Sequence, residues 1–145
     1  MLLPDVNVVL MGLRPELSDD AERVRNWLER HLTGNQVIGV SELVLSSVVR
    51  ISTNPRLFDV PSSPLEAIEY VESVGNAPQA LMLRPGPGHW AIFRELVTEH
   101  RLRENDVPDA YFAAMALETG AVFVTRDKGF RRFAGLRVID PLDAS

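Results

Sequence analysis

The sequence contains no cysteine, and this absence excludes several kinds of site at once. Disulfide bonds, zinc sites built on thiolates and iron–sulfur clusters all require cysteine sulfur. No run reaches the roughly 18 apolar residues of a membrane-spanning helix. The apolar N-terminus carries Asp5 and no leading Lys or Arg, which makes it a poor signal peptide. We therefore expect a cytoplasmic protein without membrane association.

Lysine is also nearly missing, since Lys128 is the only lysine among 15 basic residues. Arginine favours bidentate contacts with phosphates and carboxylates, although a GC-rich genome would produce the same preference. The 20 acidic residues give a net charge of −5, which is unlike a strongly basic nucleic-acid-binding protein. A few carboxylates around a metal, with a local basic rim, would nevertheless behave differently from this average.

No linker, internal repeat or low-complexity tract divides the 145 residues, so we expect a single domain over residues 1–145. Short apolar runs alternate with segments of helical periodicity. The predicted strands are Leu2–Leu3, Gln36–Val40, Ala80–Leu83, Ala121–Thr125 and Leu136–Ile139. The predicted helices are Val6–Leu13, Asp19–Leu32, Ser41–Ile51, Pro64–Val74, Trp90–Leu102 and Pro108–Thr119. Uniformly apolar strands between helices predict an α/β protein, a three-layer α/β/α sandwich around a parallel sheet of four to five strands.

Four acidic residues lie where ligands bind in such folds, beyond the carboxyl ends of the strands. Asp5 follows the first strand, Glu42 the second and Asp127 the fourth, while Asp109 opens the helix that leads into the fourth. Each has a local explanation, because Asp5 could cap a helix, Glu42 could favour a helix dipole and Asp127 could form an Asx turn. Four such acids at one edge would be a coincidence. Oxygen ligands suit Mg²⁺ or Mn²⁺, so we predict a metal site that activates water.

Several neighbours of the four acids receive secondary roles. Asn7 and Thr125 could orient carboxylates from a second shell. A basic rim for phosphates could come from Arg50, Arg56, Arg126 and Lys128, together with Arg131 and Arg132, although ordinary solvated surface explains them equally well. We expect Asp106 to cap a helix, Asp140 to form a turn and the three histidines to be non-catalytic.

Four segments resemble the PIN domain of VapC-type toxin ribonucleases from bacterial toxin–antitoxin pairs. They are LPDVNVVL (Leu3–Leu10), VSELVLSSVVRISTNPRLF (Val40–Phe58), VPDAYFAAMALETGAVFVTRDKGF (Val107–Phe130) and RFAGLRVIDP (Arg132–Pro141). This resemblance implies a Mg²⁺- or Mn²⁺-dependent endoribonuclease that cleaves RNA phosphodiesters in single-stranded loops. It places the family's four catalytic and metal-binding acids on Asp5, Glu42, Asp109 and Asp127. It also implies a homodimer and a small antitoxin whose tail enters the active-site groove.

Three other classes remain as alternatives. A PIN-like protein without catalysis could act only as a binding partner, but the four acids are intact. A receiver-type phosphoacceptor domain would need an acidic residue after the third strand, where Arg84 and Pro85 stand instead. A haloacid-dehalogenase-type phosphatase would need an aspartate at the position of Asn7. Nucleotide-cofactor enzymes are unsupported, because neither a Rossmann glycine motif nor a Walker A motif is present.

Overall fold

The computed structural model describes residues 1–143, and within them five strands form one parallel sheet. The strands are β1 (Leu2–Pro4), β2 (Ile38–Ser41), β3 (Ala80–Leu83), β4 (Val122–Val124) and β5 (Val138–Ile139). Their spatial order is β3-β2-β1-β4-β5, and every neighbouring pair is parallel. The predicted parallel sheet is confirmed. The predicted domain also includes residues 144–145, which lie outside the described residues.

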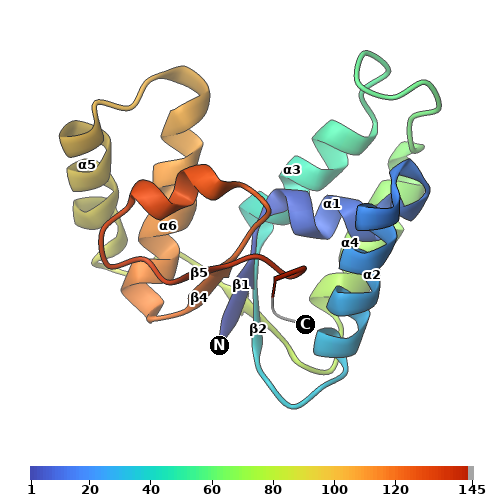
Figure 1. Ribbon diagram of the computed structural model, residues 1–145, viewed down its shortest axis with the longest axis horizontal. Helices are drawn as coiled ribbons and strands as arrows, with labels where there is room; N and C mark the ends of the chain where they lie inside the picture. Colours follow the sequence, from blue (N-terminus) through green and yellow to red (C-terminus); the bar gives the residue numbers. More distant parts are fainter. Residues whose placement is uncertain (144–145) are drawn as a thin grey trace.

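Helices cover both faces of this sheet. They are α1 (Val6–Leu13), α2 (Asp19–Leu32), α3 (Glu42–Ser52), α4 (Pro64–Gly75), α5 (His89–His100) and α6 (Val107–Thr119), with short 3-10 helices η1 (Pro15–Leu17), η2 (Glu104–Asp106) and η3 (Lys128–Arg132). Figure 1 shows α1–α4 on one side of the sheet and α5 and α6 on the other, which confirms the three-layer sandwich. No helix in the described range is long and apolar enough to cross a bilayer.

The central strands and the helix beside them form the core. Leu3 on β1 and Phe123 on β4 are fully buried. In α6, the buried small residues Ala110, Ala113 and Ala114 allow the helix axis to approach the sheet closely. The carboxyl ends of β1 and β4 are therefore held by the best-packed part of the molecule, which makes them a rigid platform for a site.

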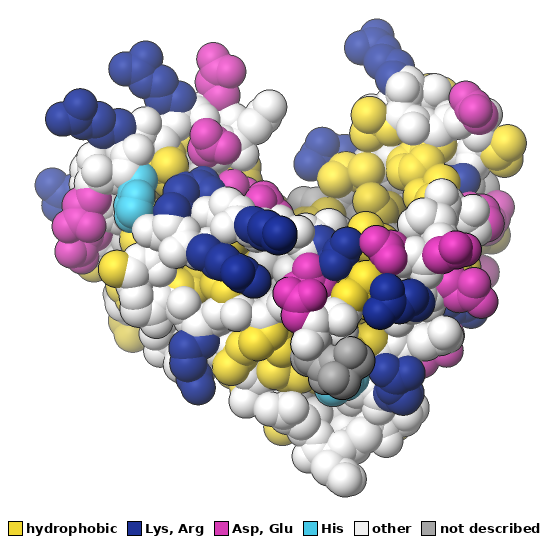
Figure 2. Space-filling model, viewed as in Figure 1, with side chains coloured by type: hydrophobic (Ala, Val, Ile, Leu, Met, Phe, Trp, Pro, Cys, Tyr) yellow, Lys and Arg dark blue, Asp and Glu magenta, His cyan; other side chains and the backbone are white. Residues whose placement is uncertain are grey.

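The direction of the chain reverses at this platform. From β1 the chain runs through β2 to β3 on one side, and it then crosses to β4 and β5 on the other. The helices that follow β1 and the helices that precede β4 consequently lie on opposite faces. A crevice opens between them at the carboxyl ends of the two strands, where ligands of doubly wound sheets bind. Figure 2 shows the molecule hollowed between its two lobes at this edge.

Candidate active site

Three acidic side chains from distant parts of the chain line one cavity in this crevice. Its volume is about 780 Å³, and its lining includes Asp5, Asp109 and Asp127. We call these three residues the acid cluster. Asp5 directly follows β1, Asp127 lies just beyond β4, and Asp109 lies in the first turn of α6. The predicted convergence of these three acids is observed.

Asp5 is the buried member of the acid cluster, and its carboxylate accepts three hydrogen bonds. It precedes α1, and its Oδ1 accepts the Val6 amide N–H over 2.7 Å, so the capping role and the site position coincide. Its Oδ2 accepts the Thr125 hydroxyl over 2.7 Å and the Asn7 side-chain amide over 3.1 Å. Burial raises the pKa of Asp5 from 3.8 to about 6, against the hydrogen bonds from Thr125 and Val6 that lower it; Asp109 and Asp127 add repulsion.

Asn7 and Thr125 fix the direction of the Asp5 carboxylate through a small hydrogen-bond network. The Asn7 amide nitrogen donates to Asp5 and also to Thr125 Oγ1 over 3.0 Å, while its oxygen accepts the backbone N–H of Arg126 over 3.1 Å. Thr125 Oγ1 additionally accepts the backbone N–H of Asp127 over 3.0 Å. Both residues therefore lie where the sequence predicted them, in direct contact with an acid.

The other two acids are nearer to solvent. Burial raises the pKa of Asp109, and repulsion between its carboxylate and that of Asp127 raises it further. Arg132 lowers this pKa by donating to Asp109 Oδ2 over 3.2 Å. Asp127 begins η3, and its Oδ1 accepts the Gly129 N–H over 2.8 Å. Asp127 thus forms the predicted Asx-type turn and faces the cavity as well.

Glu42 is the predicted acid that the structure does not bring into the cluster. It is the first residue of α3, and its exposed carboxylate pairs with Arg84, at the end of β3, over 3.4 Å. Glu42 lines a different groove, between α3, α4 and β3. The next residue, Leu43, lines the cavity, but the Glu42 side chain points toward Arg84.

The predicted basic rim divides into residues that reach the cavity and residues that do not. Arg50 on α3 lines the cavity. Arg56 is exposed in the loop after α3, and Lys128 is exposed at the start of η3. These three positions remain open to solvent and a ligand.

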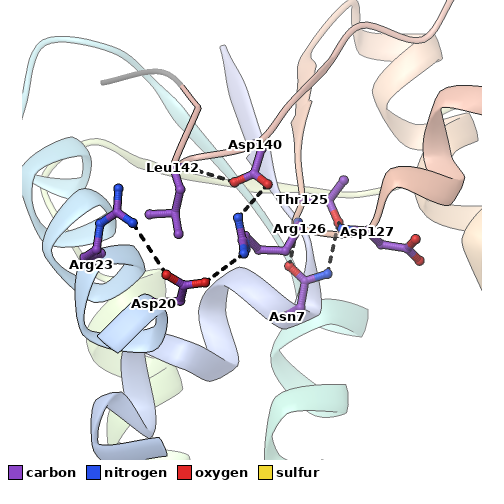
Figure 3. A network of polar contacts seen from close by, with 8 residues as sticks. All are labelled: Asn7, Asp20, Arg23, Thr125, Arg126, Asp127, Asp140 and Leu142. Carbon is purple, nitrogen blue, oxygen red and sulfur yellow. Dashed lines mark hydrogen bonds and ion pairs between the residues drawn. The ribbon is translucent and has the colours of Figure 1, made fainter. Parts of the chain in front are cut away.

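Arg126, a predicted RNA contact, extends away from the cavity. Its guanidinium donates to Asp140 Oδ2 over 2.7 Å and to Asp20 Oδ2 over 3.1 Å, away from the cavity. Figure 3 shows Arg126 and Asp127 extending in opposite directions just beyond the end of β4. Asp140 does form the predicted turn, because its Oδ1 accepts the Leu142 N–H, but it is also the buried partner of Arg126.

The prediction that Asp106 caps a helix is wrong. It holds the position before α6, but its side chain makes no capping hydrogen bond. Its backbone is already helical, with φ −83° and ψ −17°, because η2 runs directly into α6. A capping side chain needs an extended backbone to reach back to the first amides, and this residue lacks one.

The comparisons with known proteins agree with this geometry. A model of the PIN domain family matches residues 2–136. The chain belongs to the PIN-domain family. Among its relatives, VapC ribonuclease Mb2897 of Mycobacterium bovis is 41% identical over 143 residues, covering 99% of this chain and 97% of that protein. Ribonuclease VapC25 of Mycobacterium tuberculosis is 37% identical over 141 residues, covering 97% and 99%.

Solved structures of toxin–antitoxin complexes share the fold of this PIN domain. A chain of VapBC2 from Rickettsia felis, bound to a DNA fragment from its promoter, superposes with a TM-score of 0.69 at 15% identity, covering 96% of this chain and 97% of that one. VapBC-1 from nontypeable Haemophilus influenzae gives a TM-score of 0.66 at 18% identity, covering 97% and 98%. At these identities the match concerns the fold.

The acid cluster of this PIN domain suits a hard divalent cation for two reasons, the oxygen atoms that it offers as ligands and its negative charge. It offers carboxylate oxygens only, and the mutual repulsion of Asp5, Asp109 and Asp127 is what a cation relieves. Within residues 1–143, however, no three Asp, Glu or His side chains are already arranged as a ligand set. Asp109 is paired with Arg132 and Glu42 with Arg84 in this arrangement.

Sequence reasoning missed two features of this PIN-domain site. The first is the pairing of Arg132 with Asp109, which are 23 positions apart. The second is the aromatic wall of the cavity, to which α5 contributes Phe93 and α6 contributes Tyr111 and Phe112.

Proposed function

We propose that this chain is a VapC-type toxin, an endoribonuclease that hydrolyses RNA phosphodiesters with Mg²⁺ or Mn²⁺ and is neutralised by a cognate antitoxin. The observation that carries the proposal is the meeting of Asp5, Asp109 and Asp127 in one cavity at the switch point of the sheet. The relatives at 37–41% identity are named as ribonucleases, and their similarity covers nearly the whole chain.

Asp5, Asp109 and Asp127 would hold the metal, directly or through water. Glu42, the second acid by family resemblance, would join them only by leaving Arg84. When bound, the metal would supply an activated water and neutralise charge on the phosphate oxygens. The chain's own groups do the positioning, because Thr125 and Asn7 hold Asp5 Oδ2 in one direction.

The substrate path follows the cavity. Arg50, which lines the cavity, would bind a phosphate of the substrate, and the exposed Lys128 and Arg56 would bind phosphates farther along the strand. The cavity is a hollow between two lobes, and a single strand with unstacked bases enters such a hollow more easily than a rigid duplex. Single-stranded loops of structured RNA are therefore the expected targets.

The partners follow from the same relationship. Structural neighbours include toxin–antitoxin complexes, so we propose a small antitoxin that covers this groove and places a basic side chain against the acids. We also propose a homodimer and a cytoplasmic location, as the sequence predicts.

Cleavage assays test the proposal directly. The purified protein with Mg²⁺ or Mn²⁺ should cut total tRNA or ribosomal RNA, and EDTA should abolish the cleavage. Asp5→Ala and Asp109→Asn should also abolish it, while their circular dichroism spectra keep the wild-type fold. A protein that binds RNA but never cleaves it under these conditions would be a PIN-like binding module, and the enzymatic proposal would be wrong.

A further inference from the structure

An arginine of this chain already occupies part of the acid cluster. Arg132 Nη2 donates to Asp109 Oδ2 over 3.2 Å. Among the ion pairs formed by residues 1–143, this is the only one that involves Asp5, Asp109 or Asp127. The guanidinium of Arg132 therefore places a positive charge of the protein directly beside the proposed metal site.

Two further contacts hold the Arg132 guanidinium in this position. Its Nη1 donates to the backbone carbonyl of Gly129 over 2.6 Å, and its central carbon lies 4.5 Å from the centroid of the buried Phe133 ring. The guanidinium is thus held by three contacts, with the Gly129 carbonyl, the Phe133 ring and the Asp109 carboxylate. Such a side chain loses little additional entropy on pairing with Asp109, unlike a freely moving surface arginine.

The same guanidinium also stands close to Asp127. A Cβ atom built on Gly129 would lie 2.9 Å from Arg132 Nη1 and 3.0 Å from Asp127 Oδ1. A side chain at position 129 would therefore require the end of Arg132 to shift. Among the ion pairs of residues 1–143, Arg132 pairs with Asp109 and not with Asp127.

This arrangement solves an electrostatic problem of the metal-free protein. Three carboxylates at one cavity repel each other, and one of them is buried. A fixed cation beside Asp109 offsets part of that repulsion. A bound divalent cation would offset the same repulsion and would need the same Asp109 oxygen.

We propose that Arg132 is an internal counter-ion of the acid cluster and releases Asp109 when a divalent cation binds. The inference rests on the proposed function, because it treats the cluster as a metal site. Arg132 then weakens metal binding by the strength of its own pair with Asp109. For a partly exposed pair this strength corresponds to about two- to five-fold in a binding constant.

The test measures binding of Mn²⁺ alone, without RNA, by electron paramagnetic resonance or calorimetry. Arg132→Gln is compared with Arg131→Gln, which removes the same charge from the neighbouring position. Arg131 lies in the same 3-10 helix, is exposed, and forms no ion pair within residues 1–143. The control therefore subtracts the general effect of a lost positive charge. Arg132→Lys, which keeps the charge but loses the planar fork, is the second variant.

We expect Arg132→Gln to bind Mn²⁺ about two- to five-fold more tightly than Arg131→Gln. Arg132→Lys, which keeps the net charge, should lie between the wild type and Arg132→Gln. Equal affinities for Arg132→Gln and Arg131→Gln would overturn the counter-ion role while leaving the proposed function intact. Weaker binding by Arg132→Gln would also overturn it, because Arg132 would then be positioning Asp109 for the metal. If the wild-type protein binds no Mn²⁺, the counter-ion role and the metal dependence of the proposed function fail together.

Discussion

The buried carboxyl of Asp5 should make the stability of the metal-free protein depend on pH. Its pKa is raised from 3.8 to about 6 in the folded state, so the folded protein holds a proton at this residue that the unfolded chain has already released. Stability from this source is fully present below pH 3.8 and is lost as the pH rises through 6. At 1.36 kcal/mol per pKa unit, the loss amounts to about 3 kcal/mol, most of it between pH 4 and 7.

Asp5→Asn isolates this contribution, because the amide has nearly the same shape and does not ionise. The substitution places an N–H₂ group opposite the donors of Asn7 and Thr125, which lowers stability by an amount that does not change with pH. The quantity to compare is therefore the change of the unfolding free energy with pH. Urea unfolding in EDTA, repeated from pH 4 to 8, should show the wild-type stability falling relative to the variant by about 2–3 kcal/mol.

Glu66→Gln, which removes an exposed carboxylate in the first turn of α4, controls for the loss of a negative charge outside the site. Parallel pH profiles for the wild type and Asp5→Asn would refute the reasoning, since they would mean that Asp5 ionises equally in the folded and unfolded states. Mn²⁺ at pH 7 should restore stability to the wild type, because a bound cation compensates the buried charge.

Further outcomes follow from the contacts around the site. Thr125→Val removes a hydroxyl that binds Asp5, and it should lower cleavage about 10- to 100-fold in kinetic assays while raising the pKa of Asp5 further. Asp140→Asn weakens the pair with Arg126 and should lower the unfolding free energy by about 1–2 kcal/mol in urea titrations, since one partner is nearly buried and the other is not. Arg126→Gln should destabilise the protein similarly without weakening RNA binding, whereas Arg50→Gln should weaken RNA binding in salt titrations and leave stability unchanged.

The fold and most of the site were accessible from the sequence because both depend on the backbone. Alternating apolar strands and amphipathic helices specify a parallel sheet, and the sheet brings the residues after its strands to one edge. Asp5, Asp109 and Asp127 reach the cavity for that reason. Thr125 meets Asp5 for the same reason, since it directly follows the strand beside β1.

The errors arose where the direction of a side chain mattered. Glu42 starts a helix at the correct edge, but its long flexible side chain takes Arg84 as its partner, and chain topology contains no information about that choice. Arg126 is a different case, because its direction could have been deduced. Successive side chains in an extended segment point to opposite sides. Continuing this alternation beyond the end of β4, with Thr125 facing Asp5, would have directed Arg126 away from the cavity and toward Asp140, as observed.

The contact between Arg132 and Asp109 could not be predicted from the sequence for a similar reason, because it depends on the direction of a side chain. Arg132 belongs to the 3-10 helix η3, and the carbonyl of Gly129 in the same helix accepts a hydrogen bond from its guanidinium. A basic residue near acids in the sequence therefore says little about its role. The local backbone conformation determines whether such a residue faces solvent, a substrate phosphate or a carboxylate. In this protein that conformation directs Arg131 outward and Arg132 onto Asp109.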